Sequence, residues 1–193
     1  WDASSTATDN NGTIVKLADT TTGRFIRVDQ TRISVRMFGA KGNGSTDDYT
    51  AIQAAINSIS SVGGTIFFPV GDYLINTQLI VTTPGTQLVG DGIDSTWNTP
   101  SHFGSRIIGG NTTGAVIWIK VESCTVSNLV IDASTTRRNA ALNLTQSLCN
   151  AGIRVEATDV AAPNGDVFDT TLERVFVRYQ PGDGILLIGR IYG

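Results

Sequence analysis

The chain has 193 residues and a formal net charge of −3, and 16% of its residues are charged against 40% that are hydrophobic. Without a long run of Lys or Arg, it lacks the clustered positive charge that nucleic-acid binding requires. No apolar stretch approaches the ~20 residues that cross a bilayer, so neither nucleic acid nor membrane is expected as a partner.

The first 32 residues form a polar leader with few large apolar side chains. Ser, Thr, Asp and Asn dominate residues 1–13, a composition typical of a linker or neck rather than of a packed core. One short strand is predicted at residues 24–28. The expected organisation is therefore a leader or neck over residues 1–32, followed by one folded unit over residues 33–193.

A Gly-rich turn at residues 39–44 separates the first two elements of the folded unit. The strand predicted before the turn covers residues 35–38. After the turn, Ser45 or Thr46 is expected to cap an α-helix at about residues 47–60. One narrow apolar stripe on this helix fits a role in covering the exposed end of a stacked sheet. The stripe consists of Ile52, Ala55, Ile56 and Ile59.

Beyond the helix, short apolar strands alternate with turns rich in Gly, Asn, Asp and Pro. The later strands recur in pairs: residues 114–119 with 125–131, residues 152–156 with 171–177, and the start of a third pair at residues 184–188. Each pair is too small to bury its apolar face alone. We therefore expect the pairs to stack, with strands ~4.8 Å apart, and the insertions between them to form projecting loops.

These features predict an all-β fold, a parallel β-helix or solenoid whose N-terminal end is covered by one α-helix. The apolar strand at residues 184–188 is followed by no capping element, so its edge would expose unpaired backbone N–H and C=O groups and favour aggregation. We therefore expect the chain to be the first part of a longer solenoid that continues past Gly193.

Three segments, residues 35–48, 51–56 and 63–69, carry a resemblance to a known family. They resemble the opening of the pectate-lyase-like superfamily, which is common in phage tailspike depolymerases and in related secreted polysaccharide enzymes. The likeness extends over about residues 33–190. It implies a right-handed parallel β-helix, and in tailspikes a homotrimer on the virion whose N-terminus meets tail or baseplate proteins. Such a protein binds, and often cleaves, a bacterial surface polysaccharide outside the host cell.

The resemblance is compatible with three functions. The first, which the likeness favours, is a phage tailspike depolymerase that attacks capsule or O-antigen for host recognition. The second is a virion adhesin or structural tail protein with the same fold and no catalysis. The third is a secreted bacterial enzyme similar to a pectinase. A motif that encodes the first coils specifies the fold rather than the substrate or the reaction.

Strand alternation selects three candidate catalytic carboxylates that face outward: Asp132, Glu156 and Glu173. Hydrolysis of a polysaccharide requires two carboxyl groups, about 5 Å apart for retention or 6.5–9.5 Å apart for inversion. Elimination requires a base and a cation or Arg that neutralises a uronate. The alternative, which the sequence favours, is that these side chains form structural ion pairs. The partners in that alternative are Arg154, Arg174 and Arg178.

Four residues are candidates for substrate binding: Trp118, Arg137, Arg138 and Arg154. Trp118 faces outward if its neighbours face inward, and an exposed indole offers a flat surface to a sugar ring. The Arg side chains suit an acidic glycan because a guanidinium binds a carboxylate through two hydrogen bonds. The alternatives are a Trp buried in the interior or at a trimer interface, and an Arg pair in a solvated loop.

No metal or cofactor is expected. Cys124 and Cys149 lack the spacing of a zinc site, and His102 cannot complete one with them, so two reduced and mostly buried thiols are predicted. The acidic pair Asp47-Asp48 is interpreted as part of the start of the helix.

Overall fold

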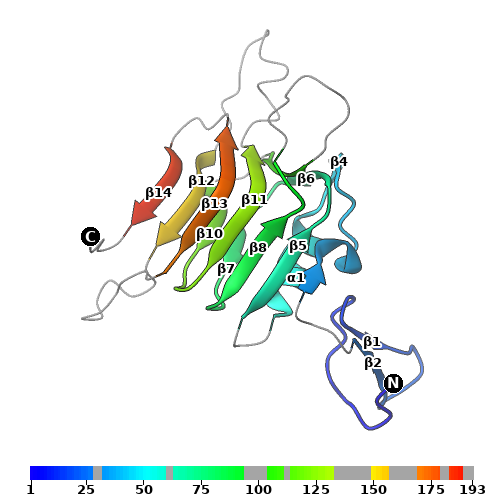
Figure 1. The fold of residues 1–193 in the computed structure, drawn as a ribbon. Helices are drawn as coiled ribbons and strands as arrows, with labels where there is room; N and C mark the ends of the chain where they lie inside the picture. The colour runs from blue at the N-terminus through cyan, green and yellow to red at the C-terminus, as the bar shows by residue number, and fades with distance from the viewer. Residues whose placement is uncertain are drawn as a thin grey trace.

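The computed structural model describes residues 1–27, 32–59, 63–93, 104–110, 114–132, 149–156, 169–178 and 183–188. Within these ranges the chain forms three stacks of parallel strands, one α-helix and a small antiparallel hairpin at the N-terminus (Figure 1). The predicted all-β parallel β-helix is thereby confirmed. In this part of the chain, no helix is long and apolar enough to cross a membrane.

The three stacks are named here after their middle strands. The β8 stack contains β3 (Arg32–Ser34), β5 (Gly64–Phe68), β8 (Thr86–Gly90) and the first halves of β11 (Thr125–Asp132) and β13 (Thr171–Arg178). The β9 stack contains β4 (Asn43–Asp47), β6 (Gly71–Ile75), β9 (Ser105–Gly109) and the second halves of β11 and β13. The β10 stack contains β7 (Leu79–Val81), β10 (Gly114–Ile119), β12 (Cys149–Glu156) and β14 (Asp183–Ile188).

A bend lets β11 and β13 serve two stacks at once. Residues 125–127 of β11 pair with β8, residues 129–132 pair with β9, and Asn128 between them has φ 54°. Arg174 lies at the same level of the next coil, with φ 50°. A positive φ turns the chain and resets the alternation of side chains. This explains why Leu129 and Val175 face inward although strict alternation from the start of each strand would point them outward.

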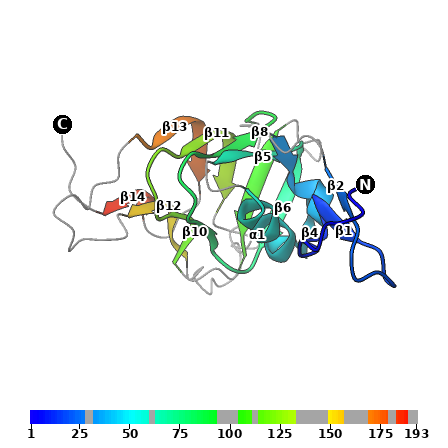
Figure 2. The same cartoon turned by 90° about the horizontal axis from the view of Figure 1, so that it is seen from below.

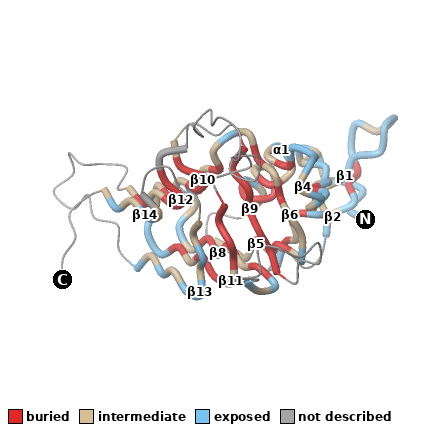
Figure 3. The backbone as a smooth tube through the Cα atoms, turned by 90° about the horizontal axis from the view of Figure 1, so that it is seen from above, coloured by how far each residue is buried: buried red, intermediate tan, exposed pale blue. Residues whose placement is uncertain are grey.

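The core consists of inward side chains that lie in register from coil to coil. In the β8 stack, Ile66 pairs with Leu88 and Leu88 with Val126, and all three are at most 1% exposed. The other two stacks contribute equivalent rows, and buried residues run through the centre of the solenoid in Figure 3. Full burial of one such aliphatic side chain stabilises the fold by about 1.5–3 kcal/mol.

Helix α1 (Tyr49–Asn57) lies near the N-terminal end of the solenoid, as Figure 2 shows. It packs against β7, the first strand of the β10 stack, and buries Ile52, Ala55 and Ile56 of the predicted stripe. The side chain of Gln53 completes the edge of that stack. Its Oε1 accepts a hydrogen bond from the N–H of Ile80 at 2.9 Å, and its Nε2 donates to the carbonyl of Ile80 at 2.9 Å. The amide thus substitutes for a neighbouring strand.

Two local predictions before the helix are wrong. Residues Val35–Phe38 form a 3-10 helix, η1, rather than a strand, because the Ser34 hydroxyl accepts the N–H of Arg36 and Gly39 closes the turn at φ 97°. The strand in this part of the chain is β3, which ends immediately before η1. Ser45 and Thr46 lie within β4 and do not cap α1.

The acidic pair before α1 fixes the start of the helix and the preceding loop. Asp47 accepts the N–H of Tyr49 at 3.1 Å, which satisfies one free donor of the first helical turn. The buried carboxylate of Asp48 accepts the N–H groups of Lys41 and Gly42 at 2.7 and 2.9 Å. The interpretation of this pair as structural is therefore supported by its contacts.

The N-terminal segment forms a two-stranded antiparallel hairpin, β1 (Ile14–Lys16) with β2 (Arg24–Ile26). The second strand matches the one predicted near residues 24–28. Gly12 lies directly against the ring of Phe38 in η1, so this segment touches the first coil of the solenoid. Apolar side chains remain exposed on the hairpin: Trp1, Val15, Leu17 and Phe25.

The contact between Gln53 and Ile80 leads to the first prediction. Gln53→Leu keeps most of the side-chain volume but leaves two backbone groups of Ile80 without their partner, which should lower the free energy of unfolding by about 1–3 kcal/mol. Urea unfolding followed by circular dichroism measures the change. The control is Gln87→Leu in β8, which loses one exposed hydrogen bond from the Thr65 hydroxyl and has an expected effect within about 0.5 kcal/mol. Equal effects of the two substitutions would contradict the edge-capping role.

Candidate functional site

The three candidate carboxylates face outward from three different stacks. Asp132 ends β11 in the β9 stack, Glu156 ends β12 in the β10 stack, and Glu173 lies in the first half of β13, in the β8 stack. Their outward orientation follows from inward neighbours such as Leu129, Ile131, Ile153 and Val155. The structure therefore confirms the orientation and does not bring the three carboxylates together.

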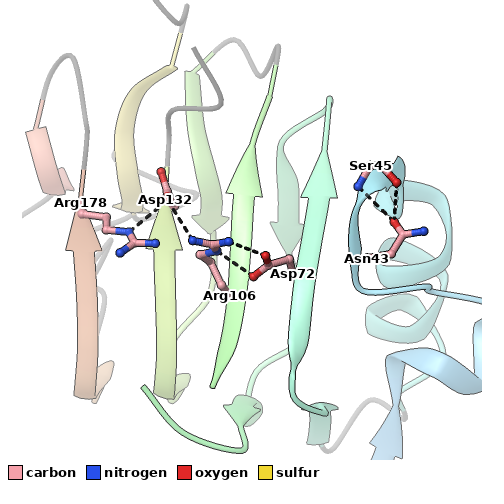
Figure 4. A network of polar contacts seen from close by, with 6 residues as sticks. All are labelled: Asn43, Ser45, Asp72, Arg106, Asp132 and Arg178. Carbon is pink, nitrogen blue, oxygen red and sulfur yellow. Dashed lines mark hydrogen bonds and ion pairs between the residues drawn. The ribbon is translucent and has the colours of Figure 1, made fainter. Parts of the chain in front are cut away.

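Asp132 belongs to a row of alternating charges that crosses four successive strands, β6, β9, β11 and β13 (Figure 4). Asp72 binds Arg106 through two hydrogen bonds, one of them 2.8 Å from Nε to Oδ1. Nη1 of Arg106 lies 3.8 Å from Oδ2 of Asp132, and Nε of Arg178 donates to the same oxygen at 3.0 Å. We call this row the charge ladder.

The central side chains of the charge ladder are buried although they point away from the solenoid core. The side chains of Arg106 and Asp132 are only 4% and 3% exposed. A buried charge is tolerated when an opposite charge and hydrogen bonds compensate for lost hydration. The alternation of two carboxylates and two guanidinium groups supplies that compensation, which favours the interpretation of Asp132 as one half of a structural ion pair.

Two members of the charge ladder, Asp72 and Arg106, are absent from the candidates that the sequence provides. A signal for them exists in hindsight. Asp72 and Arg106 occupy opposed positions of β6 and β9, as do Asp132 and Arg178 in β11 and β13. Opposite charges at matching positions of consecutive coils would have indicated these two pairs, provided that the register between coils was known. The contact between Arg106 and Asp132 is diagonal, because Arg106 is opposite Val130.

A second polar group lies on the outer surface of the β10 stack. Trp118 faces outward from β10 between the buried Ile117 and Ile119, as predicted, and is partly exposed. The Nζ atom of Lys120 lies 4.3 Å from the centre of its ring, and the guanidinium carbon of Arg154 lies 4.6 Å from it. Glu156 pairs with Arg154 at 2.7 Å between Oε2 and Nη2. We call Trp118, Lys120, Arg154 and Glu156 the Trp118 cluster.

The Trp118 cluster follows from the register of two strands. Trp118 and Arg154 are direct partners in the pairing of β10 with β12, and Lys120 and Glu156 follow one position after the last pair of inward residues. Three of the predicted site residues thus come together here: Trp118, Arg154 and Glu156. Lys120 was not a candidate, although its position two residues after an outward Trp places it on the same surface.

The remaining candidate residues, Glu173, Arg137 and Arg138, belong neither to the charge ladder nor to the Trp118 cluster as the structure describes them. Glu173 forms an ion pair with Arg174 at 3.4 Å, but both side chains are more than half exposed, where such pairs contribute little. Arg137 and Arg138 lie outside the described residues. All three carboxylates therefore form the ion pairs that the sequence offered as the alternative to catalysis, Glu156 with Arg154, Glu173 with Arg174 and Asp132 with Arg178.

Cys124 is a free, buried thiol in the turn before β11. Burial raises the pKa of this thiol to about 11, so it carries almost no thiolate near neutral pH. The side chain of Cys149 lies outside the described residues. Among the residues whose placement is described, no three His, Cys, Asp or Glu side chains lie close enough to hold a metal ion.

Comparison with protein families gives one extensive match. Residues 32–186 match the family described as rhamnogalacturonase A/epimerase, pectate lyase-like. A glucan 1,3-beta-glucosidase of Cochliobolus carbonum is 38% identical over 74 residues, which are 38% of this chain and 9% of that protein.

Two solved structures with a similar backbone come from bacteriophages. The enzymatically active domain of tailspike protein 2 of bacteriophage CBA120 has a TM-score of 0.66 at 20% identity, over 93% of this chain and 25% of that one. Tailspike protein gp49 of the Acinetobacter baumannii bacteriophage Fri1, a capsular polysaccharide depolymerase, has a TM-score of 0.59 at 17% identity. That match covers 91% of this chain and 31% of gp49. The chain thus spans about a third or less of each of these proteins, and at these identities the structural likeness concerns the fold.

The burial of the charge ladder leads to a prediction for Asp132. Asp132→Asn removes one carboxylate from buried guanidinium groups and should lower the free energy of unfolding by about 3 kcal/mol or more. Glu173→Gln removes the carboxylate of an exposed pair and should change it by about 0.5 kcal/mol or less. Urea unfolding of both variants measures the contrast. A stable Asp132→Asn protein would contradict the structural role and return Asp132 to the candidate acids.

The thiol of Cys124 supplies a chemical prediction. In a Cys149→Ser background, the folded protein should react very slowly with iodoacetamide at pH 8, because burial and a pKa of about 11 withhold the thiolate. The same protein in urea should react at the rate of an ordinary free Cys. Mass spectrometry of timed samples measures both rates. Fast reaction of the folded protein would show that the turn before β11 opens.

Proposed function

Because this chain belongs to the rhamnogalacturonase A/epimerase, pectate lyase-like family, we propose that it is part of a phage tailspike that binds a bacterial surface polysaccharide. In this proposal the polysaccharide is a capsule or an O-antigen, binding serves host recognition, and the full-length protein cleaves the bound chain. The two tailspike neighbours support the proposal, and one of them is described as a capsular polysaccharide depolymerase.

The observation that carries the proposal is the outward position of Trp118 on the β10 stack. A half-buried indole has a fixed orientation, and the part of its face that Lys120 and Arg154 leave uncovered can pack against the C–H face of a sugar ring. Lys120 and Arg154 beside it supply donors for hydroxyl and carboxylate oxygens. Sites for small ligands combine such an aromatic surface with a few fixed polar groups. Arg137 and Arg138 remain predicted contacts outside the described residues.

The positions of the acids favour a second candidate function, a virion adhesin that binds without cleavage. The Trp118 cluster contains one carboxylate, Glu156, whereas hydrolysis requires two. Asp132 and Glu173 lie on other stacks. Within the described coils the cluster is therefore equipped for binding. In the depolymerase proposal Glu156 is the candidate acid that meets the glycan, and its catalytic partner comes from elsewhere in the full-length protein.

We further propose that residues 1–32 form the neck that joins the β-helix to tail or baseplate proteins of the virion, in a homotrimer. The exposed apolar side chains of the N-terminal hairpin support this assignment, because Trp1 and Phe25 contact each other at 4.9 Å between ring centres and both remain half exposed. Exposed aromatic groups that lie side by side are typical of a surface that meets another protein.

Trp118→Ala tests the proposed binding surface. The substitution should weaken binding to the recognised polysaccharide about tenfold or more, since stacking and the two neighbouring cations lose their support. Affinity electrophoresis in gels that contain purified capsules or O-antigens from a panel of bacteria measures the binding. The matched control is Trp1→Ala, which removes an exposed Trp from the N-terminal hairpin and should leave binding unchanged.

Two outcomes would contradict the proposal. If neither capsule nor O-antigen retards the protein, the proposed function is wrong; if Trp118→Ala and Trp1→Ala behave alike, Trp118 is not the binding surface. Incubation of the full-length protein with the bound polysaccharide separates the two candidate functions. New reducing ends or the ultraviolet absorbance of unsaturated uronate indicate a depolymerase, and an unchanged polymer indicates an adhesin.

A further inference from the structure

Residues 1–27, called the arm here, are joined by hydrogen bonds that extend beyond the pairing of β1 with β2. Asp2 and Arg24 exchange two backbone hydrogen bonds, at 2.8 and 2.9 Å. The buried guanidinium of Arg24 donates from Nε to the carbonyl of Ala7 at 2.6 Å. These bonds attach the chain before β1 to the second strand of the hairpin. The arm is therefore a small folded body, although its composition is that of a linker.

Two polar side chains hold the loop at residues 9–13 of the arm in one conformation. Oδ1 of Asn10 accepts three backbone N–H groups at 2.9, 2.9 and 3.1 Å, and the carboxylate of Asp9 accepts two more at 2.7 and 2.8 Å. The donors are the N–H groups of Asn11, Gly12, Thr13, Ile14 and Lys16. A short Asn or Asp side chain that bonds the following backbone fixes a turn in this way. Gly12 is thus held at a fixed place in the arm.

The arm meets the first coil of the solenoid at Gly12, and Figure 2 shows β1 and β2 beside that end. A Cβ atom on Gly12 would collide with three ring atoms of Phe38, so the backbone of Gly12 touches the ring directly. The partly buried Phe38 also packs against the hydrophobic core. Gly12 does not have the positive φ of Gly23 or Gly39, so its backbone would accept any residue. The approach of the Phe38 ring is therefore what requires a glycine at this position.

Exposed apolar side chains of the arm lie on one face of the hairpin. Val15 and Phe25 are direct partners in the pairing of β1 with β2, and the ring of Trp1 lies against Phe25. All three side chains are at least 41% exposed. Because the arm is one body, the direction in which this apolar face points is set by how the arm docks on the solenoid.

We propose that the arm is a rigid body that the contact between Gly12 and Phe38 holds on the first coil, and that this contact opens while the arm stays folded. Among the described strands β1 pairs only with β2, so no ladder of backbone hydrogen bonds joins the arm to the solenoid. The contact is small beside the strand pairings inside either body and should open first. A partner that binds the apolar face only when the arm is docked would close it. The docked and open states exist whether or not the chain recognises a polysaccharide.

A pair of spin labels measures the position of the arm. Thr21→Cys in the arm and Gln87→Cys in β8 replace exposed residues, and in a Cys149→Ser background the other thiol is the buried Cys124. Dilution with unlabelled protein restricts pulsed electron paramagnetic resonance to distances within one chain. The arm without further substitution should give one narrow distance distribution. A broad distribution at this stage would overturn the docked position.

Gly12→Leu should open the contact, because the new side chain takes the place of the Phe38 ring, and a broad distribution should replace the narrow one. Phe38→Ala should also broaden the distribution, and the two substitutions together should broaden it no further than either alone. The matched control is Gly92→Leu. A Cβ atom there meets no neighbour and Gly92 has no positive φ, so the narrow distribution should remain. Equal distributions for Gly12→Leu and Gly92→Leu would overturn the role of the contact.

Amide hydrogen exchange followed by mass spectrometry shows whether the arm stays folded. In Gly12→Leu, the amides of residues 14–16 and 24–26, which pair β1 with β2, should remain as protected as in the unmodified protein. Loss of that protection would mean that the arm needs the solenoid in order to fold, and it would overturn the proposal of a rigid body on a contact that opens.

Discussion

Every strand of this solenoid depends on a neighbouring coil for its backbone hydrogen bonds. A buried N–H or C=O group without a partner is costly, so the first coil of the stack must be closed by something other than a strand. Helix α1 provides the closure for the β10 stack. It buries its apolar stripe against the interior and presents the Gln53 amide, whose donor and acceptor replace the missing strand at Ile80. From β7 onward, the inward residues of this stack stay in register from coil to coil.

That register determines what the outward side chains can do. Inward positions are filled mostly with Ile, Leu and Val, together with the aromatic residues Phe68 and Tyr73, so the charged side chains that could take part in chemistry lie in the outward rows. Where the outward residues of successive coils alternate in charge, as from Asp72 to Arg178, the row neutralises itself and becomes part of the scaffold. Where the row combines an indole with two cations and one carboxylate, as at Trp118, the charges do not balance within the row. The same architecture thus produces a structural row and a candidate site on different faces.

Much of the fold was predictable from the sequence because its signals are local. The apolar stripe of α1 and the alternation within strands each depend on a few neighbouring residues. The error at residues 35–38 was also local: Ser34 caps a 3-10 helix that Gly39 ends, and four residues are too few for apolar periodicity to separate such a helix from a strand. Ser45 lies in β4, which pairs with β6 of the next coil, so its role depends on a contact distant in sequence. Alternation correctly placed Asp132, Glu156 and Trp118 outward. It could not pair Asp132 with Arg106 or Trp118 with Lys120 and Arg154, because such contacts depend on register between coils and on rotamers.

The spacing of coils also limits where a pair of catalytic carboxylates can form on such a fold. Strands of one stack lie ~4.8 Å apart, so outward residues one coil apart match the ~5 Å of a retaining pair, and residues two coils apart approach the longer separation of an inverting pair. Asp72 and Asp132 occupy one stack in strands separated by β9, but Asp132 is level with Leu74 rather than with Asp72, two residues farther along the strand. The strand between them contributes Arg106, whose guanidinium contacts both carboxylates. Arg106 lies between the two carboxylates and pairs with both, which favours a structural role for the row over the action of a pair of acids.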